Sequence, residues 1–117
     1  MTDYISIFDE FQYLIDSYMI IENITDKAKS VLKIKVKFVD GTSLNIYESN
    51  NYILDKHKYG YQWMSRGEEL IHRWDNTPHH PHILTFPYHQ HIGSEQNVHP
   101  SEKMTLYEVF IFIQNSL

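Results

Sequence analysis

The chain has 117 residues, of which 42% are hydrophobic, and it carries a formal net charge of −5 without a cysteine. The length suits one domain with its own core, and the acidic balance argues against a protein that binds nucleic acid with its whole surface. The lack of thiols excludes disulfides, thiolate zinc sites and cysteine nucleophiles. Because no run of about 18 apolar residues is present, we expect residues 1–117 to form a single α+β domain with no membrane partner.

An amphipathic helix is predicted at the start of the chain. Apolar side chains recur at three- and four-residue spacing from Tyr4 to Tyr18, and Asp3 stands where a helix cap is expected. The segment 17–25 (SYMIIENIT) is short and rich in residues that favour β-structure, so it predicts a strand.

A stripe of lysines is predicted on the next strand, in the segment VLKIKVKFV (31–39). Lysines alternate there with apolar residues, so an extended strand places Lys33, Lys35 and Lys37 on one face. Such alternation is typical of the solvated face of an antiparallel sheet. The functional alternative is a lysine ladder that binds the phosphates of a substrate, and these three lysines are therefore candidate substrate-binding residues.

Two hairpins and a closing helix complete the predicted fold. Asp40-Gly41 is a strong hairpin signal before 42–49 (TSLNIYES), and a second hairpin joins 59–65 to 69–74 through Arg66-Gly67. A short strand is expected within 85–92, a polar loop over 93–103, and a C-terminal helix from a Thr105–Glu108 capping box. Its predicted buried stripe is Leu106, Val109, Phe110 and Ile113. Together these elements predict an α+β fold with an N-terminal and a C-terminal helix on an antiparallel sheet of about five or six strands.

The segment from His72 to His91 (HRWDNTPHHPHILTFPYHQH) has the most unusual composition in the chain. It holds His72, His79, His80, His82, His89 and His91, together with Pro78, Pro81 and Pro87. Prolines lack a backbone donor and interrupt helices and central strands, so the segment is predicted to contain a stiff loop that carries imidazoles. Imidazole exchanges protons near neutral pH and is a common metal ligand.

One interpretation of these histidines is a metal centre. His89 and His91 on a strand would point to the same side, and His79 or His80 could complete a three-nitrogen set that leaves zinc an open position. The candidate metal ligands are therefore His79, His80, His89 and His91.

The favoured interpretation needs no cofactor and uses acid–base catalysis on a phosphodiester. Such a reaction requires a base, an acid and a cation near neutral pH, which two histidines and an arginine supply. Arg73 is the expected phosphate clamp and Asp75 the group that orients an imidazole, although the two could form a plain salt bridge. Asn76 is a candidate substrate contact or a turn residue. The candidate catalytic residues are Arg73, Asp75, His79, His80, His89 and His91.

The block HRWDNTPHHPHILTFPYHQHI (72–92) resembles the signature of the TumE-like toxin family of type II toxin–antitoxin systems. The matching positions are Arg73, Asp75, Asn76, Pro78, His79, His80, Pro81, Thr85, Phe86, Pro87, His89 and His91. Tyr88 stands where many relatives have another histidine, which argues against an indispensable catalyst at that position. The resemblance implies a cytoplasmic toxin that a cognate antitoxin protein neutralises.

Three hypotheses follow for the function. The first is a toxin that acts as a metal-independent endoribonuclease on RNA, partly by analogy with other compact α+β toxins. The second is a hydrolase or nuclease that needs a divalent metal such as zinc, and the third is a non-catalytic binding module. A second copy of the chain, as a homodimer, is a further candidate partner.

Overall fold

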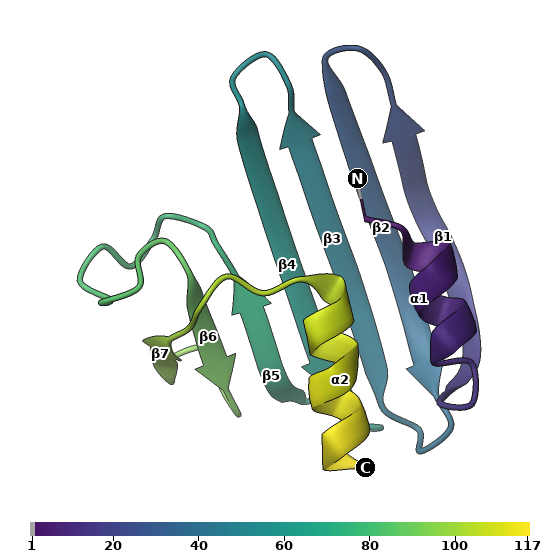
Figure 1. Ribbon diagram of the computed structural model, residues 1–117. Coiled ribbons are helices and arrows are strands. Elements are labelled where there is room, and N and C mark those ends of the chain that lie inside the picture. The colour runs from purple at the N-terminus through teal and green to yellow at the C-terminus, as the bar shows by residue number, and fades with distance from the viewer. Residues whose placement is uncertain (1) are drawn as a thin grey trace.

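The computed structural model describes residues 2–117 as one seven-stranded antiparallel sheet with two helices on one of its faces (Figure 1). The strands follow one another across the sheet in sequence order. The elements are α1 (Tyr4–Glu10), β1 (Ile15–Thr25), β2 (Lys29–Phe38), β3 (Ser43–Asn51), β4 (Lys56–Met64), β5 (Leu70–Asp75), β6 (His89–Ile92), β7 (Val98–Pro100) and α2 (Leu106–Ser116). The predicted α+β fold with a helix near each end is confirmed, with seven strands in place of five or six.

Side chains alternate between the two faces of the sheet along each strand. In β2 the even-numbered residues from Leu32 to Phe38 are buried beneath the helices, whereas Lys33, Lys35 and Lys37 point to the opposite face. The predicted alternation of this strand is confirmed. We call the face under α1 and α2 the covered face and the opposite one the open face.

The core of the protein lies between the covered face and the two helices. The predicted capping box of α2 is present, with reciprocal hydrogen bonds between Thr105 and Glu108. The predicted stripe is also buried, namely Leu106, Val109, Phe110 and Ile113. The ring of Phe110 packs 5.7 Å from that of Phe8 in α1 and 5.8 Å from that of Phe38 in β2. No helix within residues 2–117 is long and apolar enough to cross a membrane.

The first helix is shorter than its apolar spacing predicts. It ends at Glu10, and β1 begins at Ile15, so the predicted continuation to Tyr18 is wrong. Phe11 and Leu14 are still buried, but they lie in the turn that follows the helix. The apolar spacing therefore continues beyond the helix into a turn. The helix cannot extend to Tyr18 because the chain joins the sheet at Ile15, which pairs with Phe38 of β2.

The seventh strand, β7, lies in the segment that was predicted to be a polar loop. It has three residues, and it pairs with β6 through Pro100 opposite His89 and Val98 opposite His91. A strand this short and polar has too few residues to establish a period of two, so the sequence does not reveal it. The strand expected within 85–92 begins only at His89.

The register of the sheet aligns two rows of side chains across the open face. Both predicted hairpins are present, and Gly41 takes a φ of +91° in the first, a conformation that favours glycine. Consecutive pairings bring β4, β5 and β6 together so that two sets of residues lie side by side. These rows are Gly60, Asp75 and His89 in one, and Gln62, Arg73 and His91 in the other.

Candidate functional site

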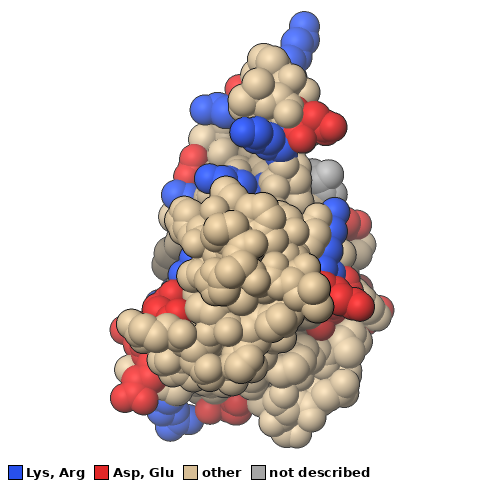
Figure 2. Space-filling model, turned by 90° about the vertical axis from the view of Figure 1, so that its left-hand side faces the viewer, with Lys and Arg blue, Asp and Glu red and all other residues tan. Residues whose placement is uncertain are grey.

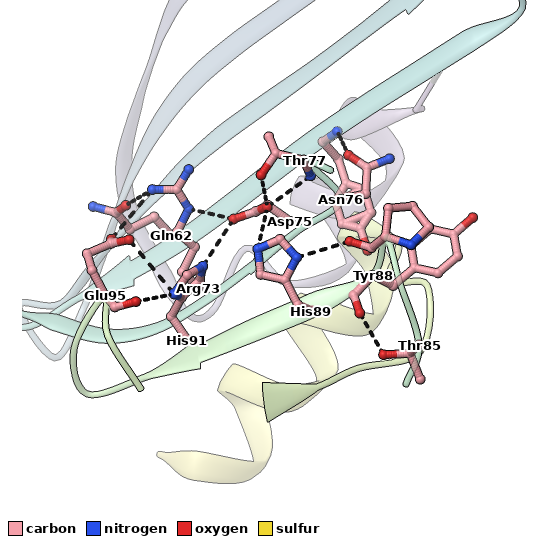
Figure 3. Close-up of polar contacts among 12 residues, drawn as sticks. Gln62, Arg73, Asp75, Asn76, Thr77, Thr85, Tyr88, His89, His91 and Glu95 are labelled. Atoms are coloured by element: carbon pink, nitrogen blue, oxygen red, sulfur yellow. Dashed lines mark hydrogen bonds and ion pairs between the residues drawn. The ribbon is translucent and has the colours of Figure 1, made fainter. Parts of the chain in front are cut away.

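The carboxylate of Asp75, at the end of β5, is the centre of a polar cluster on the open face (Figure 3). Its Oδ1 accepts hydrogen bonds from the backbone N–H and the hydroxyl of Thr77, at 3.0 and 2.7 Å, and from His89 Nε2 at 2.8 Å. Its Oδ2 accepts one from Arg73 Nε at 3.0 Å and lies 3.5 Å from His91 Nε2. Asp75 is only 2% exposed, so these groups replace the water that its charge requires.

The surroundings of Asp75 keep it ionised. Burial by itself raises the pKa of its carboxyl, but the hydrogen bonds from Thr77 and the charges of His89 and Arg73 outweigh burial. The net effect is a pKa below the ordinary value of 3.8. Asp75 is therefore an anion at neutral pH, suited to orienting its neighbours and not to exchanging protons.

Both ring nitrogens of His89 are used within the protein. Nε2 faces Asp75 Oδ1, and Nδ1 lies 3.0 Å from the carbonyl oxygen of Pro87. Both partners only accept hydrogen bonds, so each ring nitrogen of His89 that carries a proton has an acceptor within reach. With a side chain that is 2% exposed, His89 ties the segment before it to β5.

His91 is oriented differently, with one nitrogen free of a short hydrogen bond. Its Nδ1–H donates to the backbone carbonyl of Glu95 at 2.7 Å. That bond places a proton on Nδ1 and turns Nε2 toward Asp75 Oδ2, 3.5 Å away. Nε2 is therefore the atom through which His91 can exchange a proton or bind a ligand.

His80 approaches the two buried histidines from residues 76–88, which we call the histidine loop. Its ring centroid lies 4.8 Å from that of His89 and 5.9 Å from that of His91. Partial burial lowers the pKa of His80, and the charges of His89 and His91 lower it further. The imidazole of His80 is therefore neutral at neutral pH and can accept a proton.

The three imidazoles can also serve as a set of metal ligands. One nitrogen from each of His80, His89 and His91 lies within 4.8 Å of the other two. A metal bound there would require His89 to give up its hydrogen bond to Asp75 or to Pro87, because both of its nitrogens are engaged. The donor set fits zinc chemistry at this cost.

Arg73 lies beside the cluster on the same face. Its ion pair with Asp75, which was predicted as the alternative to a phosphate clamp, uses Nε, while Nη1 contacts Gln62 Oε1 at 3.3 Å and Glu95 Oε1 at 3.5 Å. These contacts leave Nη2 for a ligand, and the side chain is 32% exposed. Arg73 can therefore bring a fixed positive charge to an anion at the edge of the cluster.

Two of the predicted site residues lie apart from the cluster. The amide of Asn76 accepts a hydrogen bond from the backbone N–H of Tyr59 and donates one to the carbonyl of His57, so it ties the histidine loop to β4. His79 is exposed and is not part of the group of three imidazoles.

Figure 2 shows the loop side of the molecule, where the centre of the surface carries no Lys, Arg, Asp or Glu.

The three lysines predicted to bind substrate all lie on the open face of β2, but they do not all line the same hollow. Lys33 and Lys35 line a hollow that Arg73 also lines. Lys37 lines a second hollow together with Arg66. The structure thus brings two of the three lysines into the same hollow as the arginine of the cluster.

Three further residues complete the cluster and were not predicted from the sequence. Thr77 follows Asp75 by two positions, a spacing at which an aspartate bonds the backbone and hydroxyl beyond it, so this contact could have been found. Gln62 alternates with buried aromatic residues in β4, which also indicates the open face. Glu95 stands in an irregular segment, and nothing in the sequence points to its contact with Arg73.

The cluster as a whole brings together a neutral imidazole, a second imidazole with one available nitrogen, and an arginine. These are the groups that proton transfer at a phosphodiester requires, and the buried carboxylate of Asp75 holds them in place. The same nitrogens would suit a divalent metal. The geometry therefore offers more than a simple structural salt bridge, because it brings together several groups that can exchange protons, bind a metal or contact an anion.

A family model described as Toxin TumE matches residues 5–117. No curated protein and no solved structure matches the chain significantly.

Proposed function

The chain belongs to the TumE toxin family, and from this premise we propose that it arrests growth by cleaving RNA without a metal ion. Its partner in this proposal is a cognate antitoxin protein. The observation that carries the proposal is the convergence of His80, His91 and Arg73 around the ionised carboxylate of Asp75.

In the proposed reaction the 2′-hydroxyl of a ribose attacks the adjacent phosphorus, and the 5′-oxygen leaves. His80, whose lowered pKa keeps it neutral, takes the proton from the 2′-hydroxyl. His91 gives a proton from Nε2 to the departing 5′-oxygen. The products are a 2′,3′-cyclic phosphate and a 5′-hydroxyl, and proton exchange with water restores both imidazoles.

The remaining residues of the cluster have supporting roles in this reaction. Arg73 stabilises the charge that develops on the phosphorane oxygens through Nη2, which no contact within the cluster uses. Asp75 and His89 are positioning residues: Asp75 orients Arg73, and His89 fixes the end of the histidine loop against β5.

Purified protein should cut RNA in the presence of EDTA. His80→Ala and His91→Ala should each reduce the cleavage rate by about 10²- to 10⁴-fold, the usual contribution of a general acid or base. His79→Ala is the matched control, because this neighbouring histidine is exposed and does not belong to the group of three imidazoles, and it should cut RNA at the wild-type rate. Full activity of both His80→Ala and His91→Ala would rule out the assignment.

A divalent-metal hydrolase is the second candidate, and the three converging nitrogens of His80, His89 and His91 favour it. The same assay separates the two reactions. Loss of cleavage in EDTA, restored by stoichiometric zinc and absent from His89→Ala, would replace the metal-free mechanism. In the metal-free reaction, protein freed of metal keeps its full cleavage rate.

A further inference from the structure

A hollow on the open face adjoins the polar cluster and extends across β2, β3, β4 and β5. Its volume is about 500 Å³. The residues that matter for its chemistry are Lys33, Lys35, Tyr47, Lys58, Gly60 and Arg73. We call this hollow the groove.

Two unbroken rows of paired residues run through the groove and continue beyond it to β6, so that each row crosses five strands. The first row is Lys33, Tyr47, Gly60, Asp75 and His89. The second row is Lys35, Asn45, Gln62, Arg73 and His91. With strands about 4.8 Å apart, each row spans about 19 Å between its lysine and its histidine. The register of the sheet thus places lysines at one end of each row and histidines of the polar cluster at the other.

Gly60 leaves the middle of this path open. It lies between Tyr47 of β3 and Asp75 of β5 in the first row. A Cβ at this position would have Asp75 Cβ at 4.0 Å as its nearest neighbour, which is an ordinary contact. The backbone does not require glycine here, and what glycine provides is space beside Asp75.

Two lysines of the groove, Lys33 and Lys35, are paired with partly exposed carboxylates. Lys33 lies 3.5 Å from Glu22, and Lys35 lies 3.6 Å from Glu68. Both pairs are partly exposed, and exposed ion pairs contribute little to stability. The phosphates of a bound nucleic acid can therefore replace these carboxylates as partners of the two lysines, and the protein loses no strong interaction.

Tyr47 adds an aromatic surface to this row of cations. Its side chain is 37% exposed although it lies in a central strand, and Lys33 Nζ lies 5.7 Å from the centre of its ring. Exposed rings beside cationic side chains are the platforms on which proteins stack the bases of single-stranded nucleic acids. A base-paired nucleotide has both faces covered by its neighbours in the helix and cannot use such a platform.

We propose that the groove binds a single-stranded segment of RNA, with one base stacked on Tyr47 and the backbone phosphates on Lys33, Lys35 and Lys58. The inference rests on the proposed ribonuclease function, because that function names RNA as the ligand. Single-strandedness also suits the chemistry: attack by the 2′-hydroxyl in line with the leaving oxygen requires a nucleotide that can leave the geometry of the A-form helix. Gly60 gives the strand room to pass from Tyr47 to His80 and Arg73.

Binding can be measured without cleavage by using RNA whose 2′-hydroxyls are methylated, since it cannot undergo the proposed attack. Fluorescence anisotropy should show the labelled single strand binding at least about 10-fold more tightly than its duplex. Tyr47→Ala should weaken single-strand binding by about 10-fold, the loss expected for one stacked base. Tyr47→Phe should retain it. Tyr52→Ala, which removes an exposed tyrosine outside the groove, is the matched control and should bind as the wild type does.

Gly60→Val tests the path itself, since it fills the groove and places a residue that favours strands in β4. It should melt as the wild type does and bind the single strand about 10-fold more weakly. Equal binding of single strand and duplex, or wild-type binding by both Tyr47→Ala and Gly60→Val, would overturn the inference. If Tyr47→Ala and Gly60→Val both bound the single strand normally and still cleaved unmodified RNA, the groove would be refuted as the binding site while the proposed reaction would stand. Single-strand binding that depends on Tyr47, without any cleavage, would uphold the groove and refute the proposed reaction.

Discussion

The covered and open faces are built from the same strands but differ in what their side chains do. In β4 the residues under the helices are aromatic and buried, whereas those on the open face include Lys58, Gly60 and Gln62. Apolar burial provides most of the free energy of folding, and here it lies on one side of the sheet. The other side can therefore carry lysines, an arginine and a vacant glycine position at little cost in stability.

Asp75 is an exception to this difference between the two faces. It points to the open face, yet it is as buried as the aromatic core and bonds to His89 and Thr77. A buried charge contributes to stability only while its partners are present. We therefore expect changes at Asp75 to affect both stability and activity, unlike changes elsewhere on either face.

The largest effect on stability alone should come from Phe110→Ala on the covered side. Phe110 of α2 is fully buried against Phe8 of α1 and Phe38 of β2, and removal of such a ring costs about 3–5 kcal/mol. Urea denaturation should show this loss, while RNA cleavage per folded molecule should stay at the wild-type value below the transition. Phe112→Ala is the matched control in the same helix, because Phe112 is 39% exposed and should cost less.

A loss of cleavage by Phe110→Ala in protein that is still folded would contradict the separation of the two faces. It would mean that packing under the sheet sets the geometry of the cluster above it. The two faces of the sheet would then act together and not separately.

Asp75→Asn should have the next largest effect on stability. It replaces the buried anion with a neutral amide of the same shape that can keep the hydrogen bonds from Thr77, so we expect a net loss of about 1.5–3 kcal/mol together with loss of the orientation of Arg73. The folded-state pKa of Asp75 is lowered, so its stabilisation is fully present above the unfolded value of 3.8 and disappears as the pH falls through the folded value. The wild type should therefore lose stability in acid more steeply than Asp75→Asn.

Unfolding free energies measured from neutral pH into the acid range test this prediction. The two proteins should differ most at neutral pH and converge below pH 3.8. Parallel curves would show that Asp75 has the same pKa folded and unfolded, and would remove it from the centre of the cluster.

The sequence predicts those parts of the fold that depend on local chemistry. The alternation of lysines in β2, the turn at Asp40-Gly41 and the capping box of α2 each follow from a few adjacent residues, and each is present. The end of α1 could not be predicted, because Leu14 continues the apolar spacing although it lies in a turn. Pairing with β2 decides where that helix gives way to a strand, and pairing is not a local property.

The cluster could be predicted only in part for the same reason. The period of a strand predicts that His89 and His91 point to the same side. Whether His79 or His80 joins them depends on the path of an irregular loop, which the sequence does not reveal. The alignment of Lys33 and Tyr47 with Asp75 depends on the register of three hairpins. Residues far apart in the chain are brought together by pairings that no short motif encodes.

The smallest effect on stability should come from Lys33→Gln on the open face. Its ion pair with Glu22 is exposed, so the unfolding free energy should change by no more than about 0.5 kcal/mol. Binding of single-stranded RNA should nevertheless become less sensitive to salt, with the slope of log K against log salt concentration falling by about 0.7 for one lost phosphate contact. Lys27→Gln, which removes an exposed lysine outside the groove, should leave that slope unchanged. An equal change of slope in both variants would show that the lysines act through total charge, and that the open face has no path of its own for the phosphates.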